Sequence, residues 1–423
     1  MNHKNVICMF CGALCDDLEV EVADGHITNV KNACMISKNK FMHHSENSAR
    51  PMIQGKEVTL DQAVEKSIEI LSQAKNPLIY GLSATGCEAQ GEAIALAESI
   101  GANIDSTSSV CHGPGSMAKQ MTGIATCTLG EIKNRSDLVV FWGCNPAEAH
   151  MRHFGRYSAM PAGMQITQGR KGRKLITVDV RKSKSAKISD QFIQVTPNGD
   201  YQVISVLRAL LKGQEFPSDL MVSGVRVSQL EALLEDLKNC TYGVILFGMG
   251  LTMTRGKYMN VQAALSLVSE LNAYAKVAIM PMRGHGNVAG SENTLAWQTG
   301  YPFAVNFSKG YPRFNPGEFT AVDLLARREV DAAFVIASDP MASLPFKAAE
   351  YLKQIPTIVI DPHWNETTKY AQVVLPSAMM GIEAAGTFYR MDNVPLRMKK
   401  LLEGTYPSDK DIIQRIREGV QSC

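Results

Sequence analysis

The chain has 423 residues, of which 45% are hydrophobic and 20% charged, and its formal net charge is +2. A chain of this length can bury a sizeable core and is expected to form two or three domains. The near-neutral charge gives no electrostatic reason to expect nucleic acid or a membrane surface as a partner. Because no signal peptide and no apolar run of transmembrane length is recognisable, we expect a cytoplasmic protein without membrane insertion. Ten cysteines in such a chain indicate metal binding or buried thiols in a reducing compartment.

The first fifty residues differ from the rest, because they combine short strands with several cysteines. The stretch "LEVEVADGHITNV" predicts a hairpin that turns at Asp24 and Gly25. Cys8, Cys11 and Cys15 form a C-x2-C-x3-C motif, and Cys34 follows the hairpin, so four thiolates can converge without a long loop. Four soft ligands suit an iron–sulfur cluster or a tetrahedral zinc ion. The spacing alone leaves open both of these and a set of buried thiols.

The remaining chain alternates short apolar runs, polar turns and helical patterns. Residues 60–74 and 202–212 space their apolar side chains as helices do. Continuous apolar runs of this length are typical of strands in buried parallel sheets. The alternation predicts an α/β fold with doubly wound sheets, whose ligands bind at the carboxyl ends of the strands. The predicted strands and the turns after them occupy residues 77–82, 137–146, 174–181, 242–250, 277–284, 331–340 and 357–364.

These motifs resemble one known family. Four cysteines in this spacing, followed by Lys38 or Lys40 and an α/β body, are similar to the amino-terminal [4Fe–4S] domain of the molybdopterin oxidoreductases that carry a bis-pterin guanine dinucleotide, such as formate dehydrogenases. The likeness covers nearly the whole chain. The family segments that hold the two dinucleotides resemble "FWGCNPAEAH" (141–150), "TVDVRKSKSA" (177–186), "TPNGDYQVISVLRALL" (196–211) and "ETTKYAQVVLPSAMMGIEAAGTFYRMDNVPLR" (366–397).

Polar residues after the expected strands can contact such a cofactor. Asp179 follows its strand at once, and its carboxylate can accept from the N1 and N2 donors of a guanine, with Arg181 and Ser183 nearby for phosphate. Taken singly, each of these residues can also be a helix cap or a turn residue. Backbone N–H groups can meet a pyrophosphate at Asn145, Gly199 and Asp200. For the second dinucleotide, the candidates are Gly248, Met249, Gly250, Ser338, Asp339, Pro340, Asp361, Thr367 and Thr368. The resemblance adds Lys38 to the cofactor contacts.

The stretch "SSVCHGPGS" places Cys111 in a loop of small polar residues, whereas structural cysteines usually lie in apolar runs. In the family this position holds the Ser, Cys or selenocysteine that ligates molybdenum or tungsten. His112 is the natural proton-handling group beside the metal. Arg283, in "MRGHG", offers a planar donor fork that matches a formate carboxylate, although a phosphate contact is the alternative. His285 could share either role.

The other cysteines and histidines carry no ligand spacing. Cys87, Cys127, Cys144, Cys240 and Cys423 are expected to be packing residues. His43, His44, His150 and His153 are expected to be solvated or to support other groups, and not to bind zinc.

The segments "SSVCHGPGS" and "PMRGHGNVAG" and the short length are most similar to the catalytic subunits of archaeal formylmethanofuran dehydrogenases. This resemblance implies reversible reduction of CO2 to formate, an activity of methanogenesis, at a Mo or W bis-molybdopterin guanine dinucleotide centre fed by a [4Fe–4S] cluster. The sequence does not choose between the two metals. Two alternatives are another formate dehydrogenase-like subunit and a non-catalytic scaffold in a formyltransferase/hydrolase complex. A scaffold predicts loss of the ligands, yet all of them are present here.

The family's single-chain members end in a β domain that covers the cofactor, and this chain is expected to lack it. We therefore expect partner subunits: one supplying that β domain, a metal-dependent hydrolase that condenses formate with methanofuran, and ferredoxin-type electron carriers. Three domains are expected. They are residues 1–52 with 366–423 around the iron–sulfur cluster, residues 53–112 with 241–365, and residues 113–240, the last two each binding a pterin.

Overall fold

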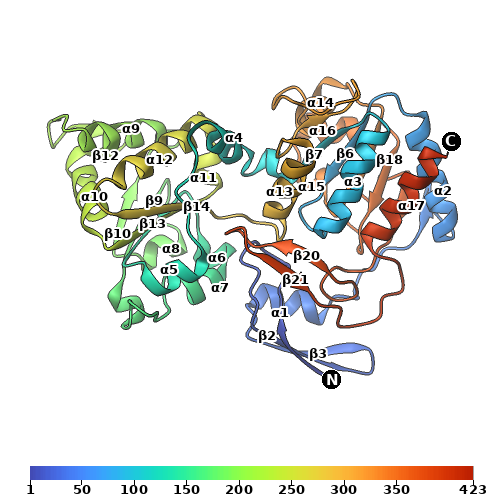
Figure 1. Cartoon of the computed structure of the whole chain (residues 1–423), viewed down its shortest axis with the longest axis horizontal. Coiled ribbons are helices and arrows are strands. Elements are labelled where there is room, and N and C mark those ends of the chain that lie inside the picture. Colours follow the sequence, from blue (N-terminus) through green and yellow to red (C-terminus); the bar gives the residue numbers. More distant parts are fainter. Residues whose placement is uncertain (423) are drawn as a thin grey trace. The chain divides into compact units, whose positions relative to one another are not determined.

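The computed structural model describes residues 1–422, so Cys423 lies outside the described part of the chain. The chain divides into two compact units. Unit 1 comprises Met1–Val110 and His285–Cys423, and unit 2 comprises Cys111–Gly284, which Figure 1 draws from teal through green to yellow. Within residues 1–422, no helix is both long and apolar enough to span a bilayer.

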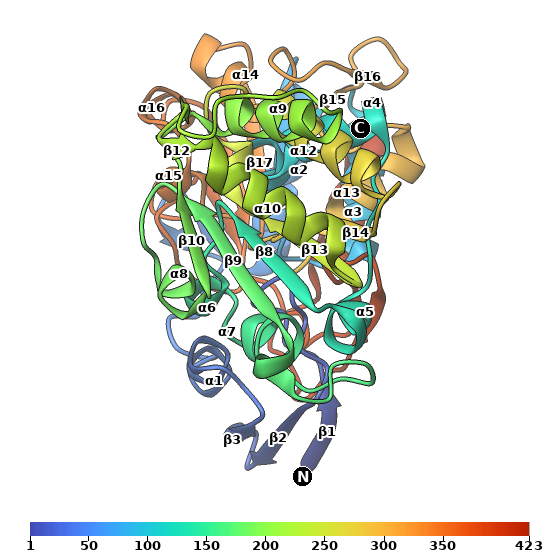
Figure 2. The same cartoon turned by 90° about the vertical axis from the view of Figure 1, so that its left-hand side faces the viewer.

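Unit 2 is built on a five-stranded parallel sheet in the order β10-β9-β8-β13-β14. Figure 2 shows β10, β9 and β8 side by side, with α10 crossing in front of the sheet. Its strands are β8 (Leu138–Trp142), β9 (Lys174–Asp179), β10 (Gln191–Gln194), β13 (Tyr242–Phe247) and β14 (Lys276–Pro281), with a small hairpin of β11 (Met221–Val222) and β12 (Val225–Arg226). Its helices are α4 (Gly113–Thr122), α5 (Leu129–Arg135), α6 (Pro146–Ala149), α7 (Met151–His153), α8 (Lys184–Ile188), α9 (Asp200–Leu211), α10 (Val227–Asn239), α11 (Met249–Thr252) and α12 (Tyr258–Leu271).

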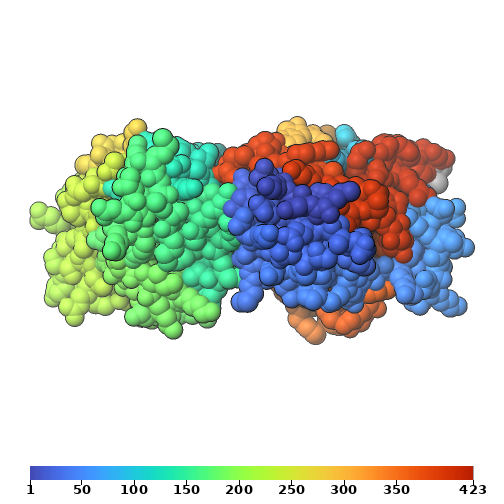
Figure 3. All heavy atoms as spheres, turned by 90° about the horizontal axis from the view of Figure 1, so that it is seen from below, coloured from blue at the N-terminus to red at the C-terminus, as the bar shows by residue number. Residues whose placement is uncertain are grey.

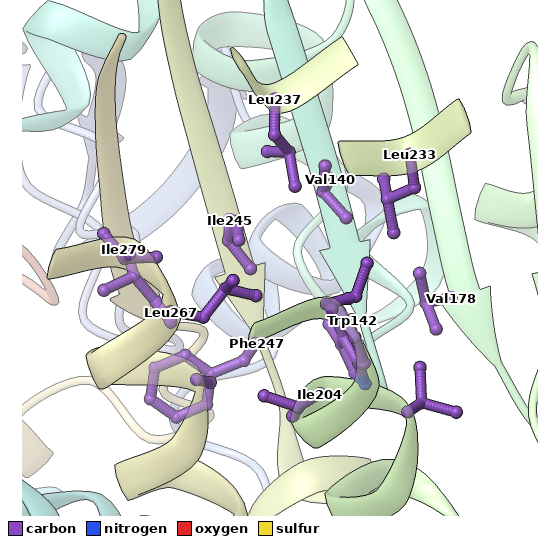
Figure 4. Close-up of a cluster of buried hydrophobic side chains, with 14 of the residues drawn as sticks. Val140, Trp142, Val178, Ile204, Leu233, Leu237, Ile245, Phe247, Leu267 and Ile279 are labelled. Carbon is purple, nitrogen blue, oxygen red and sulfur yellow. The ribbon is translucent and has the colours of Figure 1, made fainter. Parts of the chain in front are cut away.

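The core of unit 2 lies between the sheet and helices α9, α10 and α12. Val140 and Trp142 from β8 and Ile245 and Phe247 from β13 point toward these helices, where Leu233 and other apolar side chains meet them (Figure 4). All side chains of β8 and β13 are buried because helices cover both faces of the sheet, which explains the continuous apolar runs in the sequence.

Unit 1 contains a nine-stranded sheet in the order β16-β15-β7-β6-β17-β18-β19-β4-β5. Neighbouring strands from β7 to β19 are parallel, and the outer strands are antiparallel additions. One core lies under α2, α3 and α17, and a second core lies under α14 and α16 on alternate residues of β6 and β17, so the sheet is doubly wound. The strands are β4 (Met52–Ile53), β5 (Lys56–Glu57), β6 (Pro77–Gly81), β7 (Asn103–Ser106), β15 (Val305–Asn306), β16 (Arg313–Phe314), β17 (Ala332–Ile336), β18 (Thr357–Ile360) and β19 (Val373–Leu375).

The helices of unit 1 are α1 (Met35–Met42), α2 (Leu60–Gln73), α3 (Cys87–Ser99), α13 (Val288–Thr299), α14 (Ala321–Arg327), α15 (Pro340–Ser343), α16 (Phe346–Leu352) and α17 (Asp409–Gln421). The expected helix at 60–74 is confirmed as α2, which begins with a capping box between Thr59 and Gln62. In unit 2, the helix expected at 202–212 is confirmed as α9.

The N-terminal segment of unit 1 forms a small sheet of β1 (Asn2–Val6), β2 (Leu18–Ala23) and β3 (His26–Lys31). The predicted hairpin is confirmed, and Asp24 and Gly25 both adopt positive φ as its tight turn requires. Figure 3 shows this blue segment beside the red C-terminal chain, which carries the hairpin of β20 (Gly386–Tyr389) and β21 (Pro395–Met398). Backbone hydrogen bonding from Met391 N to Gly12 O joins the two.

The two units share one strand order. In unit 1 the parallel strands run β19-β18-β17-β6-β7, and in unit 2 they run β10-β9-β8-β13-β14. The connectivity differs because unit 2 is inserted between β7 and β17. The first two parallel strands of unit 1, β6 and β7, therefore match the last two strands of unit 2, β13 and β14. The structure therefore contains the same α/β unit twice, once interrupted and once continuous.

The expected domain boundaries need correction at two places. The segment 241–284 belongs to unit 2, because β13 pairs with β8 and β14 pairs with β13. Residues 366–423 are not a separate domain with the N-terminal segment, because β19 pairs with β18 and α17 packs on the core beneath α2 and α3. Sheet pairing decides the division, and the sequence gives no signal for which strands become neighbours.

Candidate functional site

Polar residues gather at the carboxyl edge of the sheet in unit 2. Asn145 follows β8, and its Oδ1 accepts hydrogen bonds from both the backbone N (3.1 Å) and Oγ (2.8 Å) of Ser185. Ser185 Oγ in turn accepts from Ala147 N at 3.1 Å. Ser183 caps the start of α8, because its side chain accepts from Ala186 N. Asn145 and the loop after Asp179 are thus held together across the ends of β8 and β9.

The same set of hydrogen bonds occurs at the carboxyl edge of the sheet in unit 1. Asp339 follows β17, and its Oδ1 accepts from the backbone N (3.0 Å) and Oγ1 (2.6 Å) of Thr367. Thr367 Oγ1 accepts from Met341 N at 3.1 Å. Pro340 begins α15 as Pro146 begins α6. The structure therefore presents the same hydrogen-bonded pair at the carboxyl edge of each sheet, Asn145 with Ser185 in unit 2 and Asp339 with Thr367 in unit 1. We call these two pairs, with the loops that carry them, the equivalent half-sites.

Ser185 is a site residue that the sequence analysis missed. It lies six residues after Asp179, just as Thr367 lies six residues after Asp361. Comparison of the two segments with each other would have found it, because both place a hydroxyl residue at the same distance from the aspartate that ends a strand.

The two aspartates at the strand ends are partly desolvated. Burial raises the pKa of Asp179, against the effect of backbone N–H donation from Val180. Burial raises the pKa of Asp361 to about 7, although His363 N and Asn365 Nδ2 donate to its carboxylate. A donor that binds these carboxylates would favour their ionised form.

Asp200 has a structural partner. Its Oδ1 accepts from Trp142 Nε1 at 2.8 Å inside the core of unit 2, and burial raises the pKa of its carboxyl group. The preceding Gly199 is sterically required, because a Cβ there would lie 2.4 Å from Ser223 Cβ. Arg181, after Asp179, acts electrostatically on that carboxylate.

The set expected for the second dinucleotide is divided between the units. Gly248, Met249 and Gly250 lie in unit 2 at the end of β13, while Ser338 to Pro340, Asp361, Thr367 and Thr368 lie in unit 1. Gly250 N donates to Gly143 O at 3.0 Å, and a Cβ on Gly250 would lie 2.7 Å from Gly143 Cα. These glycines therefore allow the loops after β8 and β13 to pack backbone against backbone.

The polar loop before Cys111 is tied to three elements of unit 1. Thr107 Oγ1 donates to Ser83 Oγ, Ser108 Oγ donates to Glu292 Oε1 at 2.6 Å, and Ser109 Oγ donates to Asp105 Oδ2 at 2.7 Å. Each of these three hydroxyls thus donates to the oxygen of a buried side chain, which explains why this loop is rich in Ser and Thr. In unit 2, Thr252 Oγ1 donates to Cys111 O at 2.7 Å and holds the cysteine itself.

His112 and Arg283 are brought together in unit 2. Both are buried, and both line a small cavity of about 10 Å³ beside the ring of Phe247. His112 Nε2 donates to Met282 O at 3.1 Å, so this nitrogen carries a proton because a carbonyl can only accept. Nδ1 is therefore the ring nitrogen at which His112 can gain or lose a proton.

Two of the four N-terminal cysteines, Cys8 and Cys34, contact Ser37. Cys8 Sγ donates to Ser37 Oγ at 3.2 Å, and Ser37 N donates to Cys34 Sγ at 3.4 Å. Cys8 N donates to Cys15 O at 2.8 Å, which closes the loop that carries Cys11. Burial raises the pKa of Cys8 and of Cys11 to about 12, and neighbouring thiols add to both rises.

Throughout the described residues, no three His, Cys, Asp or Glu side chains are grouped closely enough to hold one ion. A tetrahedral zinc site needs all four ligands around one small ion.

Lys40 lies beside the cysteine loop. Lys40 Nζ is 5.3 Å from the centre of the Phe10 ring, and Lys38 and Lys40 are both exposed on α1. Lys40 also lines a cavity of about 230 Å³ in unit 1 together with Phe10, His285 and Asp361. Burial, assisted by the charge of Lys40, lowers the pKa of His285. His285 therefore belongs to this cavity, and Arg283 belongs to unit 2.

Comparison with known proteins gives consistent results. The family described as molybdopterin oxidoreductase matches residues 60–416. The B subunit of the tungsten-containing formylmethanofuran dehydrogenase 2 of Methanocaldococcus jannaschii is 47% identical over 423 residues, covering 97% of each chain. The protein of the same name from Methanococcus maripaludis is 43% identical over 409 residues, covering 95% of this chain and 94% of that one.

Among solved structures, a chain of the formyltransferase/hydrolase complex from Methylorubrum extorquens, determined with methylofuran, superposes with a TM-score of 0.72. It covers 88% of this chain and 99% of its own length at 21% identity, a likeness that concerns the fold alone. The chain thus belongs to the molybdopterin oxidoreductases, a family of oxidoreductases, and within it to the formylmethanofuran dehydrogenase B subunits.

Proposed function

We propose that this chain is the catalytic subunit of a formylmethanofuran dehydrogenase and reduces CO2 to formate reversibly at a tungsten centre held by two pterin guanine dinucleotides. Family membership implies a molybdenum or tungsten pterin cofactor, and the relatives described as tungsten-containing favour tungsten. The observation that carries the proposal is the pair of equivalent half-sites, because two like nucleotides need two like binding sites.

The residues present fit the two nucleotides. In unit 2, Asp179 would accept from the guanine N1 and N2 donors, while Arg181 and Ser183 would contact phosphate. In unit 1, Asp361 would accept from the second guanine as Asp179 would from the first. Asp339 and Thr367 would hold the neighbouring loops together as Asn145 and Ser185 do in unit 2. A guanine donating to Asp361 would counter the burial that raises the pKa of this carboxyl group to about 7.

The four cysteines fit a [4Fe–4S] cluster. In such a cluster each cysteine ligates a different iron, so the sulfurs lie further apart than the ligands of one zinc ion. Burial raises the pKa of Cys8 and of Cys11, and a bound metal would act in the opposite direction by stabilising the thiolates. Lys40 would be the cation between this cluster and the adjacent cavity of unit 1.

Cys111 would complete the ligands of the pterin-held metal, which supplies the two-electron redox chemistry when bound. The hydroxyls of residues 107–109 hold the loop before this thiol, and Thr252 holds its carbonyl. Arg283 presents a planar donor fork that orients a carboxylate and stabilises its charge. His112 takes up or releases the proton of the reaction at Nδ1, because its Nε2 is committed to Met282 O.

Replacing Arg283 by Lys is expected to lower formate oxidation about a hundredfold or more, because a point charge replaces a bidentate fork and about 2 to 4 kcal/mol of stabilisation is lost. Metal and pterin content should stay at the level of the unmodified complex. Steady-state kinetics with an artificial electron acceptor, together with metal analysis, measure both. Arg208→Lys is the matched control, since Arg208 makes a bidentate pair with Glu270 on the surface of unit 2. Joint loss of pterin, metal and activity in Arg283→Lys would show that Arg283 binds a cofactor phosphate.

The enzyme is proposed to work with partner subunits, since the relatives are named as single subunits of a dehydrogenase. One partner would carry a β domain over the cofactor, a metal-dependent hydrolase would condense the formate with methanofuran, and ferredoxin-type subunits would deliver electrons. Expressed by itself, the chain is expected to be poor in pterin and metal and inactive, because carboxylate chemistry needs a site shielded from water. Co-expression with the covering partner should restore pterin, metal and formate oxidation. A fully loaded and active isolated chain would remove the need for that partner.

A further inference from the structure

A second buried histidine contacts the backbone of Arg283. His150 Nε2 donates to the carbonyl oxygen of Arg283 at 2.8 Å, and both residues belong to unit 2. The side chain of His150 is buried, with 6% of the residue exposed. Because the acceptor is a carbonyl, Nε2 must carry a proton. Burial lowers the pKa of this imidazole, against the effect of the hydrogen bond to Arg283.

Arg283 lies where its chain leaves the sheet, so the strand ladder no longer fixes its backbone. Strand β14 ends at Pro281, after which Met282 N donates to Phe247 O at 2.7 Å and Met282 O accepts from His112. The next residue, Gly284, has open space around it, since a Cβ there would meet no atom within 4 Å. His150 thus provides a hydrogen bond on the far side of Arg283, directly before an unpacked residue.

We propose that His150 is a positioning residue that fixes the backbone of Arg283 and thereby aims its guanidinium at the substrate carboxylate. The inference rests on the proposed function, in which Arg283 orients formate. His150 ends the short helix α6, which begins directly after Asn145. The buried side chain of His150 thus links the loop that carries Asn145 to the backbone of Arg283.

The test compares His150→Phe, which keeps an aromatic ring without a donor, with His150→Gln, whose amide can still donate to the carbonyl. Both are made in the complete complex and combined with Arg283→Lys. The measurements are the KM and kcat for formate, the metal content, and the dissociation constant of formate from its effect on the W(V) electron paramagnetic resonance signal. His153→Phe is the matched control, because His153 is equally buried in the next turn and its Nδ1 lies 3.2 Å from Ser158 Oγ.

His150→Phe is expected to weaken formate binding and raise KM roughly tenfold, as for a buried hydrogen bond whose acceptor is left unsatisfied. Metal content should be unchanged. The KM of His150→Gln for formate should lie within about threefold of that of the unmodified complex. In the Arg283→Lys background, His150→Phe should add less than about twofold, because the two changes remove the same interaction. His153→Phe should leave formate binding unchanged.

Three results would overturn the positioning role: unchanged formate affinity in His150→Phe, equal penalties in both Arg283 backgrounds, or His150→Gln as weak as His150→Phe. A different result would reject the proposed function itself. If the unmodified, metal-loaded complex neither binds nor oxidises formate, the assignment to CO2 and formate chemistry fails, whatever His150 does.

Discussion

Replacing Cys111 by Ala is expected to abolish formate oxidation. The loss should exceed the roughly 10- to 100-fold cost of removing a residue that only supports a metal ligand, because Cys111 is proposed to bind the metal itself. The loop should keep its position, since Thr107, Ser108 and Ser109 hold it through their own hydroxyls and Thr252 binds the carbonyl of residue 111. The expected result is therefore a folded complex that retains pterin and has lost the thiolate.

Kinetics of formate oxidation and the W(V) resonance signal check this expectation, because removal of a sulfur ligand changes that signal. Cys111→Ser keeps a ligating oxygen, so its rate of formate oxidation should lie between those of Cys111→Ala and the unmodified enzyme. Cys144→Ala is the control: this thiol is also in unit 2, and its Sγ donates to Leu246 O. Full activity and an unaltered resonance signal in Cys111→Ala would show that this cysteine does not bind the metal.

Replacing Cys15 by Ala is expected to bleach the iron–sulfur absorbance and to abolish reduction by a low-potential donor. One of four cluster ligands is removed, and the three remaining thiols would surround an incomplete site. Pterin and tungsten content should stay largely intact, because Asn145 and Asp179 lie in unit 2, and Asp339 and Thr367 of unit 1 bond to each other without any residue of the cysteine loop. Iron analysis and the visible absorbance spectrum measure the first effect, and tungsten analysis measures the second.

The control for the cluster is Cys240→Ala. Cys240 ends α10 in unit 2, and its Sγ donates to Leu237 O, so its removal should change neither iron content nor electron transfer. An unchanged iron count in Cys15→Ala would contradict a cluster held by Cys8, Cys11, Cys15 and Cys34.

Local patterns were sufficient to predict several elements. The Asp24-Gly25 turn, helix α2, and the strands β6, β8, β9, β13, β14, β17 and β18 follow from backbone preferences and from the pattern of apolar residues. These signals depend only on neighbours within a few residues. The position of Asn145 and Asp179 after their strands could be predicted for the same reason.

Other features depend on residues far apart in the chain. The contact of Lys40 with the Phe10 ring joins residues thirty positions apart, and it depends on how α1 packs against the cysteine loop. The contact of His150 with Arg283 spans 133 positions, and spacing had indicated only that this histidine lacks metal partners. The boundary at residue 240 was wrong because the pairing of β13 with β8 crosses it.

The sequence by itself determined the composition of the site: four N-terminal thiols, a thiol in a polar loop followed by a histidine, and aspartates at strand ends. It could do so because chemistry depends on residue type and local geometry depends on short-range sterics and hydrogen bonding. Only the tertiary structure decided that the α/β unit occurs twice, with Ser185 and Thr367 as equivalent residues. Strand order is set by the burial of both faces of a sheet, an energy that belongs to the whole unit and that no short segment of the chain contains.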